Sequence, residues 1–140
     1  MSDKSWHSMN FSRGEFACKC HCGKNTVDYG LVCLLDDIHG ALREKLERKI
    51  RITVTSGNRC ESHHRAIYRD LGMKPNMGSF HLDGKAADIK AEIKLEEGGW
   101  IPVDPEIVQE VAESFNPGGL GRYSTFTHVD VRDGKARWNG

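Results

Sequence analysis

Two short segments of the chain carry side chains that bind metal ions. His81 and Asp88 lie close together, and His128 and Asp130 follow about forty positions further on. Two neutral imidazoles and one carboxylate make a three-ligand set that leaves the fourth position of a zinc ion open, which is typical of catalytic rather than structural zinc. The sequence therefore predicts a zinc site formed by His81, Asp88 and His128, and it favours a small zinc hydrolase.

The second segment has the alternation of a β-strand. On a strand, side chains two positions apart share a face, so His128, Asp130 and Arg132 are expected to project together. The intervening Val129 and Val131 then point into the core. Three polar side chains are therefore expected to converge on one face of this strand.

Small residues surround the two candidate ligands of the first segment. His81 stands just before Gly84, whose lack of a side chain lets a loop pass close to another part of the chain. Asp88 follows on the next expected strand, with Ala86 and Ala87 leaving room around it. His81 and Asp88 can therefore reach a metal ion from two adjoining elements. The alternative is that each is an ordinary hydrogen-bonded polar residue.

Hydrophobic spacing predicts the elements that position these residues. Apolar residues at intervals of three and four predict helices at 26–49, 61–71 and 105–115, the last with Asp104 as N-cap and Pro105 as its first residue. Alternating or β-branched runs predict strands at 51–55, 86–93, 120–123 and 126–132. Residues 1–23 are expected to be irregular, and 74–78 to form a loop. These elements predict an α+β fold in which helices flank a mostly antiparallel sheet.

Length, charge and hydropathy limit the classes of protein. The 140 residues are expected to form one domain, large enough to bury roughly 68% of the surface of the unfolded chain. Twenty basic and twenty acidic residues cancel, which argues against nucleic acid or a membrane as the main partner. The N-terminus lacks an apolar core of secretory length, and no stretch approaches the roughly 20 apolar residues that span a bilayer. We expect a monomer made in the cytoplasm without a signal peptide.

Three motifs carry a resemblance to a known family. They are Ser56-Gly57-Asn58-Arg59, Ser79-x-His81-x-x-Gly84-x-Ala86-x-Asp88 and His128-x-Asp130-x-Arg132. In this order they resemble the motifs of the zinc D-Ala-D-Ala carboxypeptidase family, which includes the peptidoglycan endopeptidases of phage lysins. Three further segments resemble one branch of that family, namely Glu15-Phe16-Ala17-Cys18, Cys22-Gly23 and Ala136-Arg137-Trp138. The resemblance covers nearly the whole chain and implies a hedgehog/DD-peptidase-like fold.

The resemblance also implies roles at the site. The three candidate ligands would hold zinc, a bound water would act as nucleophile, and Arg59 would help to polarise or hold the scissile carbonyl. Asp130 is the candidate for the carboxylate that manages protons. The alternative for Asp130 is that it orients His128 or pairs with Arg132.

Three other residues are assigned to the substrate side of the site. Ser79 is expected to brace the loop that presents His81. Tyr123 and Trp138 are expected to line a substrate cleft, with burial in the core as the alternative for both aromatic side chains.

The chain departs from the family pattern at three positions. Many relatives have an acidic residue three positions before the last zinc histidine, where this chain has Thr125. Asn58 replaces the aromatic residue that usually precedes the motif arginine, and His64 replaces the asparagine expected after His63. The first change leaves the general base unassigned, and the other two are expected to alter substrate fit.

Five cysteines are an odd number, and in a reducing compartment they are expected to be thiols or metal ligands rather than disulfides. Cys18, Cys20, Cys22 and Cys33 supply enough sulfur for a second, structural zinc. Their spacing is not the paired Cys-x-x-Cys of a zinc ribbon or finger, so we expect packed thiols and no second zinc. Cys60 with the two histidines at 63 and 64 is a weaker metal candidate still.

These observations predict a zinc metallopeptidase that hydrolyses an amide bond in peptidoglycan stem peptides, as a D,D-carboxypeptidase or an L,D- or D,D-endopeptidase. The expected setting is a phage or prophage lysin that acts at the cell wall, and a host enzyme is the alternative. A non-catalytic wall-binding or virion structural module that keeps the fold is the alternative from another class. A cytosolic D-Ala-D-Ala dipeptidase would share the chemistry but ignore the intact wall.

Overall fold

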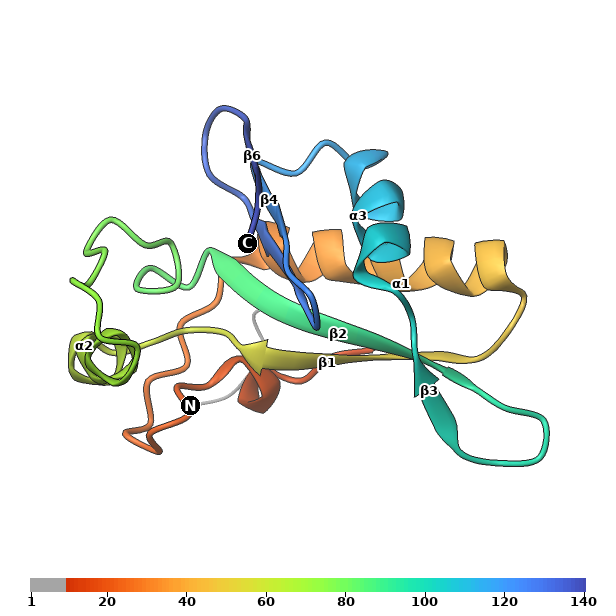
Figure 1. The fold of residues 1–140 in the computed structure, drawn as a ribbon, viewed down its shortest axis with the longest axis horizontal. Helices are drawn as coiled ribbons and strands as arrows, with labels where there is room; N and C mark the ends of the chain where they lie inside the picture. The colour runs from red at the N-terminus through yellow and green to blue at the C-terminus, as the bar shows by residue number, and fades with distance from the viewer. Residues whose placement is uncertain (1–9) are drawn as a thin grey trace.

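The structure is a computed structural model, and it describes residues 10–140 (Figure 1). The described helices are η1 (a 3-10 helix, Arg13–Phe16), α1 (Tyr29–Leu46), α2 (Glu61–Asp70) and α3 (Pro105–Glu113). The described strands are β1 (Ile50–Ser56), β2 (Ala86–Lys94), β3 (Trp100–Pro102), β4 (Gly119–Arg122), β5 (Thr127–Asp130) and β6 (Ala136–Asn139). This set of elements confirms the predicted α+β class.

All six described strands belong to one sheet, in which β2 pairs with three others. β1 pairs along one edge of β2, while β5 and β3 share the other edge. The order continues from β5 to β4 and then to β6, and the β4–β6 pair alone is parallel among the pairings described. The sheet is therefore mostly antiparallel, as predicted.

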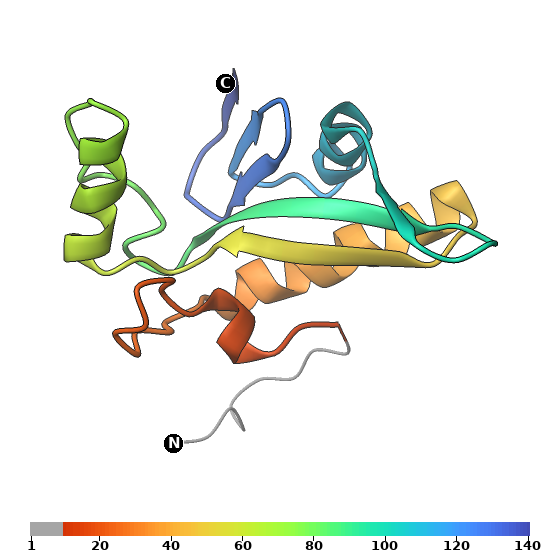
Figure 2. The same cartoon turned by 60° about the horizontal axis from the view of Figure 1, so that its bottom comes forward.

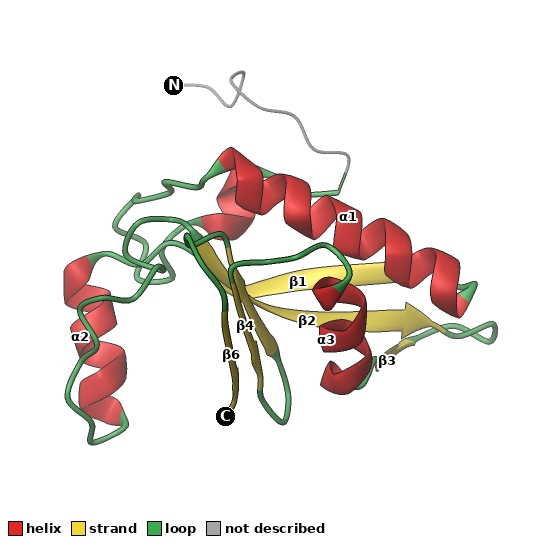
Figure 3. Cartoon of the chain, turned by 90° about the horizontal axis from the view of Figure 1, so that it is seen from above, coloured by secondary structure: helices red, strands yellow, loops and turns green. Residues whose placement is uncertain are grey.

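One hydrophobic core joins the helices to the sheet. α1 runs alongside the antiparallel pair of β1 and β2, and α3 packs against α1, β4 and β5 (Figures 2 and 3). The fully buried apolar side chains of this core include Leu31, Leu35, Ile38, Leu42, Ile89, Val108, Leu120 and Val129. α2 stands at one end of the sheet, beyond the end of β1 (Figure 2). The candidate site lies at this end, where loops carry Arg59 and His81 and strands carry Asp88 and His128.

The predicted helices form with narrower bounds. α1 begins after Asp28, whose carboxylate accepts a hydrogen bond from the Gly30 N–H at 2.7 Å, so residues 26–28 lie outside the helix. α1 stops at Glu47, which adopts a left-handed backbone conformation with φ of 51°. α3 has the predicted cap, Asp104, and the predicted first residue, Pro105.

Two strands and the 3-10 helix are not predicted from the sequence. β3 has three residues and β6 has four, which is too short for an alternating pattern to emerge. Of the segment expected to be irregular, residues 1–9 lie outside the described part of the chain. Within residues 10–140, no helix has the length and apolar character needed to cross a membrane.

Candidate metal centre and its cleft

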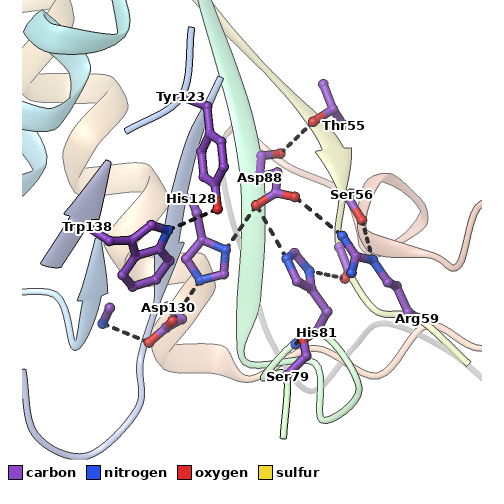
Figure 4. A network of polar contacts seen from close by, with 12 residues as sticks. Thr55, Ser56, Arg59, Ser79, His81, Asp88, Tyr123, His128, Asp130 and Trp138 are labelled. Atoms are coloured by element: carbon purple, nitrogen blue, oxygen red, sulfur yellow. Dashed lines mark hydrogen bonds and ion pairs between the residues drawn. The ribbon is translucent and has the colours of Figure 1, made fainter. Parts of the chain in front are cut away.

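The register of the sheet places site residues in one row across five strands. Ser56 of β1 pairs with Asp88 of β2, and Asp88 pairs with His128 of β5. His128 pairs with Gly121 of β4, which in turn pairs with Trp138 of β6. Paired residues on neighbouring strands present their side chains on the same face. The row therefore brings Asp88, His128 and Trp138 together (Figure 4).

Glycines at two positions of β4 make room on this face. A Cβ atom at Gly121 would collide with the indole of Trp138, and one at Gly119 would collide with the carboxylate of Asp130. With no side chain in the way, the Trp138 ring approaches the His128 ring to a centroid distance of 5.0 Å. Both glycines therefore let bulky or charged groups pack beside His128.

His81 reaches the row from the loop between α2 and β2. Its Nε2 lies 3.3 Å from Asp88 Oδ1, and His128 Nδ1 lies 3.0 Å from the same oxygen. All three side chains are buried, and their ligand atoms lie within 4.8 Å of one another, so the group can bind a metal ion. Gly84 allows the close approach expected of it, because the Thr26 carbonyl occupies the place of a Cβ atom and φ is 72°.

Hydrogen bonds on the far side of each imidazole fix the position of its proton. Nδ1 of His81 lies 2.9 Å from the Gly57 carbonyl oxygen, which only accepts, so Nδ1–H is the donor. Nε2 of His128 lies 2.7 Å from Asp130 Oδ2 and donates to that carboxylate. In its neutral form, which metal binding requires, each ring presents the lone pair of its other nitrogen on the side of Asp88. Partners of this kind orient histidine ligands around metal ions.

Asp130 lies behind His128 and is fully buried. Its oxygens accept hydrogen bonds from the Gly119 N–H, from the backbone and guanidinium of Arg132, and from His128. Burial alone would raise the pKa of Asp130, but the hydrogen bonds from His128 and Arg132 hold it well below its usual range. Of the two roles considered for Asp130, this geometry favours orienting His128 over exchanging protons with a substrate.

The side chains of His81, Asp88 and His128, here called the metal group, interact through their charges and hydrogen bonds. Burial would raise the pKa of Asp88, but hydrogen bonds from the protonated forms of His128 and His81 hold it well below its usual range. Burial would lower the pKa of His128, but hydrogen bonds to Asp130 and Asp88 raise it above its ordinary value. A proton and a metal ion therefore compete for His128 Nδ1, and metal binding is expected to weaken as the pH falls.

Arg59 lies at the other end of the row, in the turn that follows β1. Its Nη2 is 3.5 Å from Asp88 Oδ2, and its Nε donates to Ser56 Oγ at 2.9 Å. Its backbone N–H donates to the His81 carbonyl, also at 2.9 Å. The guanidinium is thereby held beside the metal group and lines the cleft above it.

His64 is a positioning residue that the sequence pattern does not reveal. It is fully buried, with Nδ1 3.2 Å from Arg59 Nη1 and Nε2 2.8 Å from the Asn76 carbonyl oxygen. Arginine only donates and a carbonyl only accepts, so His64 is neutral, with its proton on Nε2. Burial lowers the pKa of His64 and nearby Arg59 lowers it further, against the hydrogen bond to Asn76.

Protonation of His64 is expected to destabilise the fold. Because its folded pKa lies below the unfolded value of about 6.5, the unfolded chain takes up the proton first as the pH falls. The free energy of unfolding should therefore decrease below about pH 6.5, by up to about 1.4 kcal/mol per pH unit, until folded His64 is itself protonated. His64→Asn keeps an acceptor for Arg59 and cannot titrate. Urea unfolding of the wild-type and His64→Asn proteins between pH 8 and 5.5 checks this prediction. Parallel curves of unfolding free energy against pH would contradict it.

Asn58 is a buried residue that joins two segments of the chain rather than a substrate contact. Its side chain is 1% exposed; the amide donates to the carbonyl oxygens of His81 at 3.0 Å and Leu82 at 3.4 Å, and its oxygen accepts from the Thr26 N–H at 2.9 Å. These bonds tie the segment before α1 to the loop that carries His81. The expectation that this position alters substrate fit directly is therefore replaced by a structural role.

Asn58→Ala is expected to lower the free energy of unfolding by about 2–3 kcal/mol, because it removes three hydrogen bonds made by a buried side chain and opens a small cavity. Asn25→Ala, at an exposed position nearby, serves as the matched control and should change stability by less than about 0.5 kcal/mol. Urea denaturation measures the free energy of unfolding of the two variants. Equal losses of stability would contradict the structural role of Asn58.

A cleft of about 510 Å³ opens over the metal group. Its lining includes Ser79, Tyr123 and Trp138, as well as Arg59 and the three candidate ligands. Ser79 Oγ accepts from the His81 N–H at 3.3 Å, which is the expected bracing contact. Trp138 Nε1 donates to the Tyr123 hydroxyl at 2.9 Å, so these two aromatic side chains form one wall. A larger cavity, about 770 Å³, lies between the sheet and α3 and contains none of the predicted site residues.

The cleft offers few acidic groups. Thr125, at the position where relatives carry an acid, is exposed in the turn between β4 and β5. Among the described residues that line the cleft, Asp88 is the one carboxylate. The role of a separate general base is therefore not filled by Thr125, and Asp130 is enclosed behind His128.

A comparison with protein families bears on this site. A family model described as peptidase M15 matches residues 9–130, which is most of the chain and includes Arg59 and the three candidate ligands. A search of curated proteins and a search of solved structures gave no match. The match agrees with the motif resemblance and with a buried His-Asp-His group at the base of a cleft. The chain therefore belongs to the peptidase M15 family, that of the zinc D-Ala-D-Ala carboxypeptidases.

Proposed function

We propose that this protein is a zinc peptidase that hydrolyses an amide bond in peptidoglycan stem peptides. The observation that carries the proposal is the arrangement of the two histidines. His81 and His128 each have one ring nitrogen held by a fixed acceptor and the other directed at Asp88, on the floor of an open cleft.

This donor set fits zinc. Two imidazole nitrogens and one carboxylate oxygen are the ligands of many catalytic zinc sites, and the cleft leaves space for a fourth group. When bound there, zinc supplies a Lewis acid and lowers the pKa of a water molecule towards about 7. Asp130 keeps His128 in the required tautomer, and the Gly57 carbonyl does the same for His81.

Arg59 is the group best placed to hold the scissile carbonyl. Its guanidinium is fixed by Ser56 and His64 and lies beside Asp88, so it needs little rearrangement to donate to an oxygen in the cleft. Pre-positioned donors of this kind stabilise charge that develops on the carbonyl oxygen in the transition state. Tyr123 and Trp138 then supply the wall against which the peptide lies.

The charge of the cleft suits a peptide that carries carboxylates, as stem peptides do. Arg59 and Arg132 both line it, and the Arg132 guanidinium lies 4.6 Å from the centre of the Phe80 ring and 5.3 Å from that of Trp138. Cation–π contacts of this length hold the guanidinium in place while its edge stays accessible. The setting of a phage or prophage lysin is part of this proposal.

Purified sacculi provide the test. Zinc-loaded protein is expected to release peptide fragments that mass spectrometry assigns to one bond type, a chelator should stop the release, and added zinc should restore it. Cleavage that continues undiminished in the chelator would overturn the zinc mechanism. Free D-Ala-D-Ala and intact sacculi, compared side by side, distinguish a dipeptidase from a wall enzyme.

A second candidate function is a non-catalytic wall-binding module. The observation that favours it is the lack of any cleft-lining carboxylate other than Asp88 in the described chain, together with Thr125 at the position of the family's acid. Such a module would be retained on sacculi, and the same mass spectra would then show no new amino termini.

A further inference from the structure

Four of the five cysteines meet at a second place in the molecule. Cys18, Cys20 and Cys22 follow η1, and Cys60 is the N-cap of α2. Their sulfur atoms all lie within 4.8 Å of one another. Cys33, on α1, is outside this group, so the set differs from the Cys18, Cys20, Cys22 and Cys33 set considered from the sequence.

The distances fit a tetrahedral metal site. The Sγ–Sγ separations are 3.4 Å for Cys18 and Cys20, 3.6 Å for Cys20 and Cys60, and 3.8 Å for Cys18 and Cys60. Four sulfurs at about 2.3 Å from a tetrahedral zinc lie about 3.8 Å apart. A disulfide requires about 2.05 Å, and all five cysteines are free thiols.

Hydrophobic packing does not account for the cluster. Cys18 is buried, but Cys20 and Cys22 are exposed and Cys60 is half-buried. Thiols usually gather because they behave as small apolar groups in a core. Exposed thiols gain little from such burial, so their convergence on Cys18 and Cys60 indicates a ligand that holds them.

The backbone around the cluster is arranged to support thiolates. The Cys60 N–H donates to Cys18 Sγ at 3.4 Å, and the His63 N–H donates to Cys60 Sγ at 3.3 Å at the start of α2. The Cys18 N–H donates to the Lys24 carbonyl at 2.7 Å, which closes the turn that holds Cys20 and Cys22. N–H donors directed at sulfur favour its ionised form, the form that binds metal.

We propose that these four cysteines bind a second zinc ion with a structural role. Four protein ligands complete the tetrahedron and leave no position for a water molecule, unlike the site in the cleft. The ion would join the segment after η1 to the first turn of α2, directly after Arg59. The Asn58 N–H, which donates to the Phe16 carbonyl at 2.8 Å, already connects the same two segments. The metal would thereby fix the turn that positions Arg59.

Metal content measured by native mass spectrometry and elemental analysis tests the proposal. The His81→Ala protein, which lacks a ligand of the cleft site, is expected to retain one zinc per chain. Adding Cys60→Ser or Cys20→Ser to it should remove that zinc, whereas adding the control Cys33→Ser should leave it in place. Because the His81→Ala background excludes the cleft site, the result does not depend on the proposed catalytic function.

Thiol labelling and cobalt substitution provide readouts that do not rely on variants. In the zinc-loaded wild-type protein, N-ethylmaleimide should label at most one thiol rapidly, that of Cys33, and a chelator should expose the other four. Cobalt(II) at this site should give intense sulfur-to-metal charge-transfer absorption. Zinc-free His81→Ala protein in which all four cluster thiols react, iron in place of zinc, or masses lowered by the loss of two hydrogens per disulfide would each overturn the proposal.

Discussion

Replacing His81 by alanine is expected to lower kcat/KM for hydrolysis of the stem peptide by about 10³-fold or more. The loss follows because two protein ligands cannot hold the ion in place, and the several kcal/mol that a metal contributes to transition-state stabilisation are lost with it. His81 is braced by Gly57 through Nδ1 and directs Nε2 at Asp88, so its role is specific to the metal group. Steady-state kinetics on a purified stem peptide measures the effect.

His63→Ala is the matched control for this variant. His63 is a half-buried histidine on α2 and is not a member of the His-Asp-His group. Its replacement should leave kcat/KM within about twofold and the zinc content unchanged, because the side chain belongs neither to the hydrophobic core nor to a metal-binding group. If His81→Ala kept full activity, or if both variants lost activity equally, the assignment of His81 as a zinc ligand would fail.

The candidate ligands are accessible to sequence reasoning because each lies in a recognisable local pattern. Alternation along the second segment correctly places His128 and Asp130 on one face, and Gly84 marks the close approach beside His81. The order of the three motifs is enough to indicate the family, which the family match confirms. Local patterns indicate which residues share a face of a strand. This information is enough to identify ligands that lie on strands.

The register that joins these patterns is not local. Asp88 pairs with His128 across 40 positions of chain, and Gly121 makes room for Trp138 only because β6 pairs in parallel with β4. β6 has four residues and no alternation of its own, so its place in the sheet is set by tertiary contacts. The wall formed by Trp138 and Tyr123 therefore emerges only in the fold.

Two departures from the family pattern acquire a physical meaning in the structure. Asn58 and His64 look like changes on the substrate side when they are compared with the motifs alone. Both are buried, and their partners lie in other segments: Thr26 for Asn58, and Asn76 for His64. Cys60 likewise joins a cysteine 42 positions away. Contacts between residues so far apart in the sequence depend on how whole helices, strands and loops pack together. The spacing of residues in the sequence does not predict them.

Asp130→Ala is expected to lower the free energy of unfolding by about 3 kcal/mol at pH 7. The substitution leaves the Gly119 N–H without its acceptor and Arg132 without its counter-charge, and removing one partner of a buried ion pair costs about 3–5 kcal/mol. The Arg132 side chain is 25% exposed and can recover some hydration, which places the effect at the lower end. The depressed pKa of Asp130 means that its contribution is complete above about pH 4 and is lost as the pH falls further.

The same substitution should weaken zinc binding at the cleft by about 10–100-fold, because His128 loses the acceptor that fixes its tautomer. Urea unfolding and a zinc titration against a competing chelator measure the two effects separately. Asp133→Ala, at an exposed aspartate three positions further on, is the matched control and should change neither quantity. If Asp130 acted instead as the proton carrier in the cleft, Asp130→Ala would abolish turnover while zinc affinity stayed intact, and that outcome would refute an orienting role.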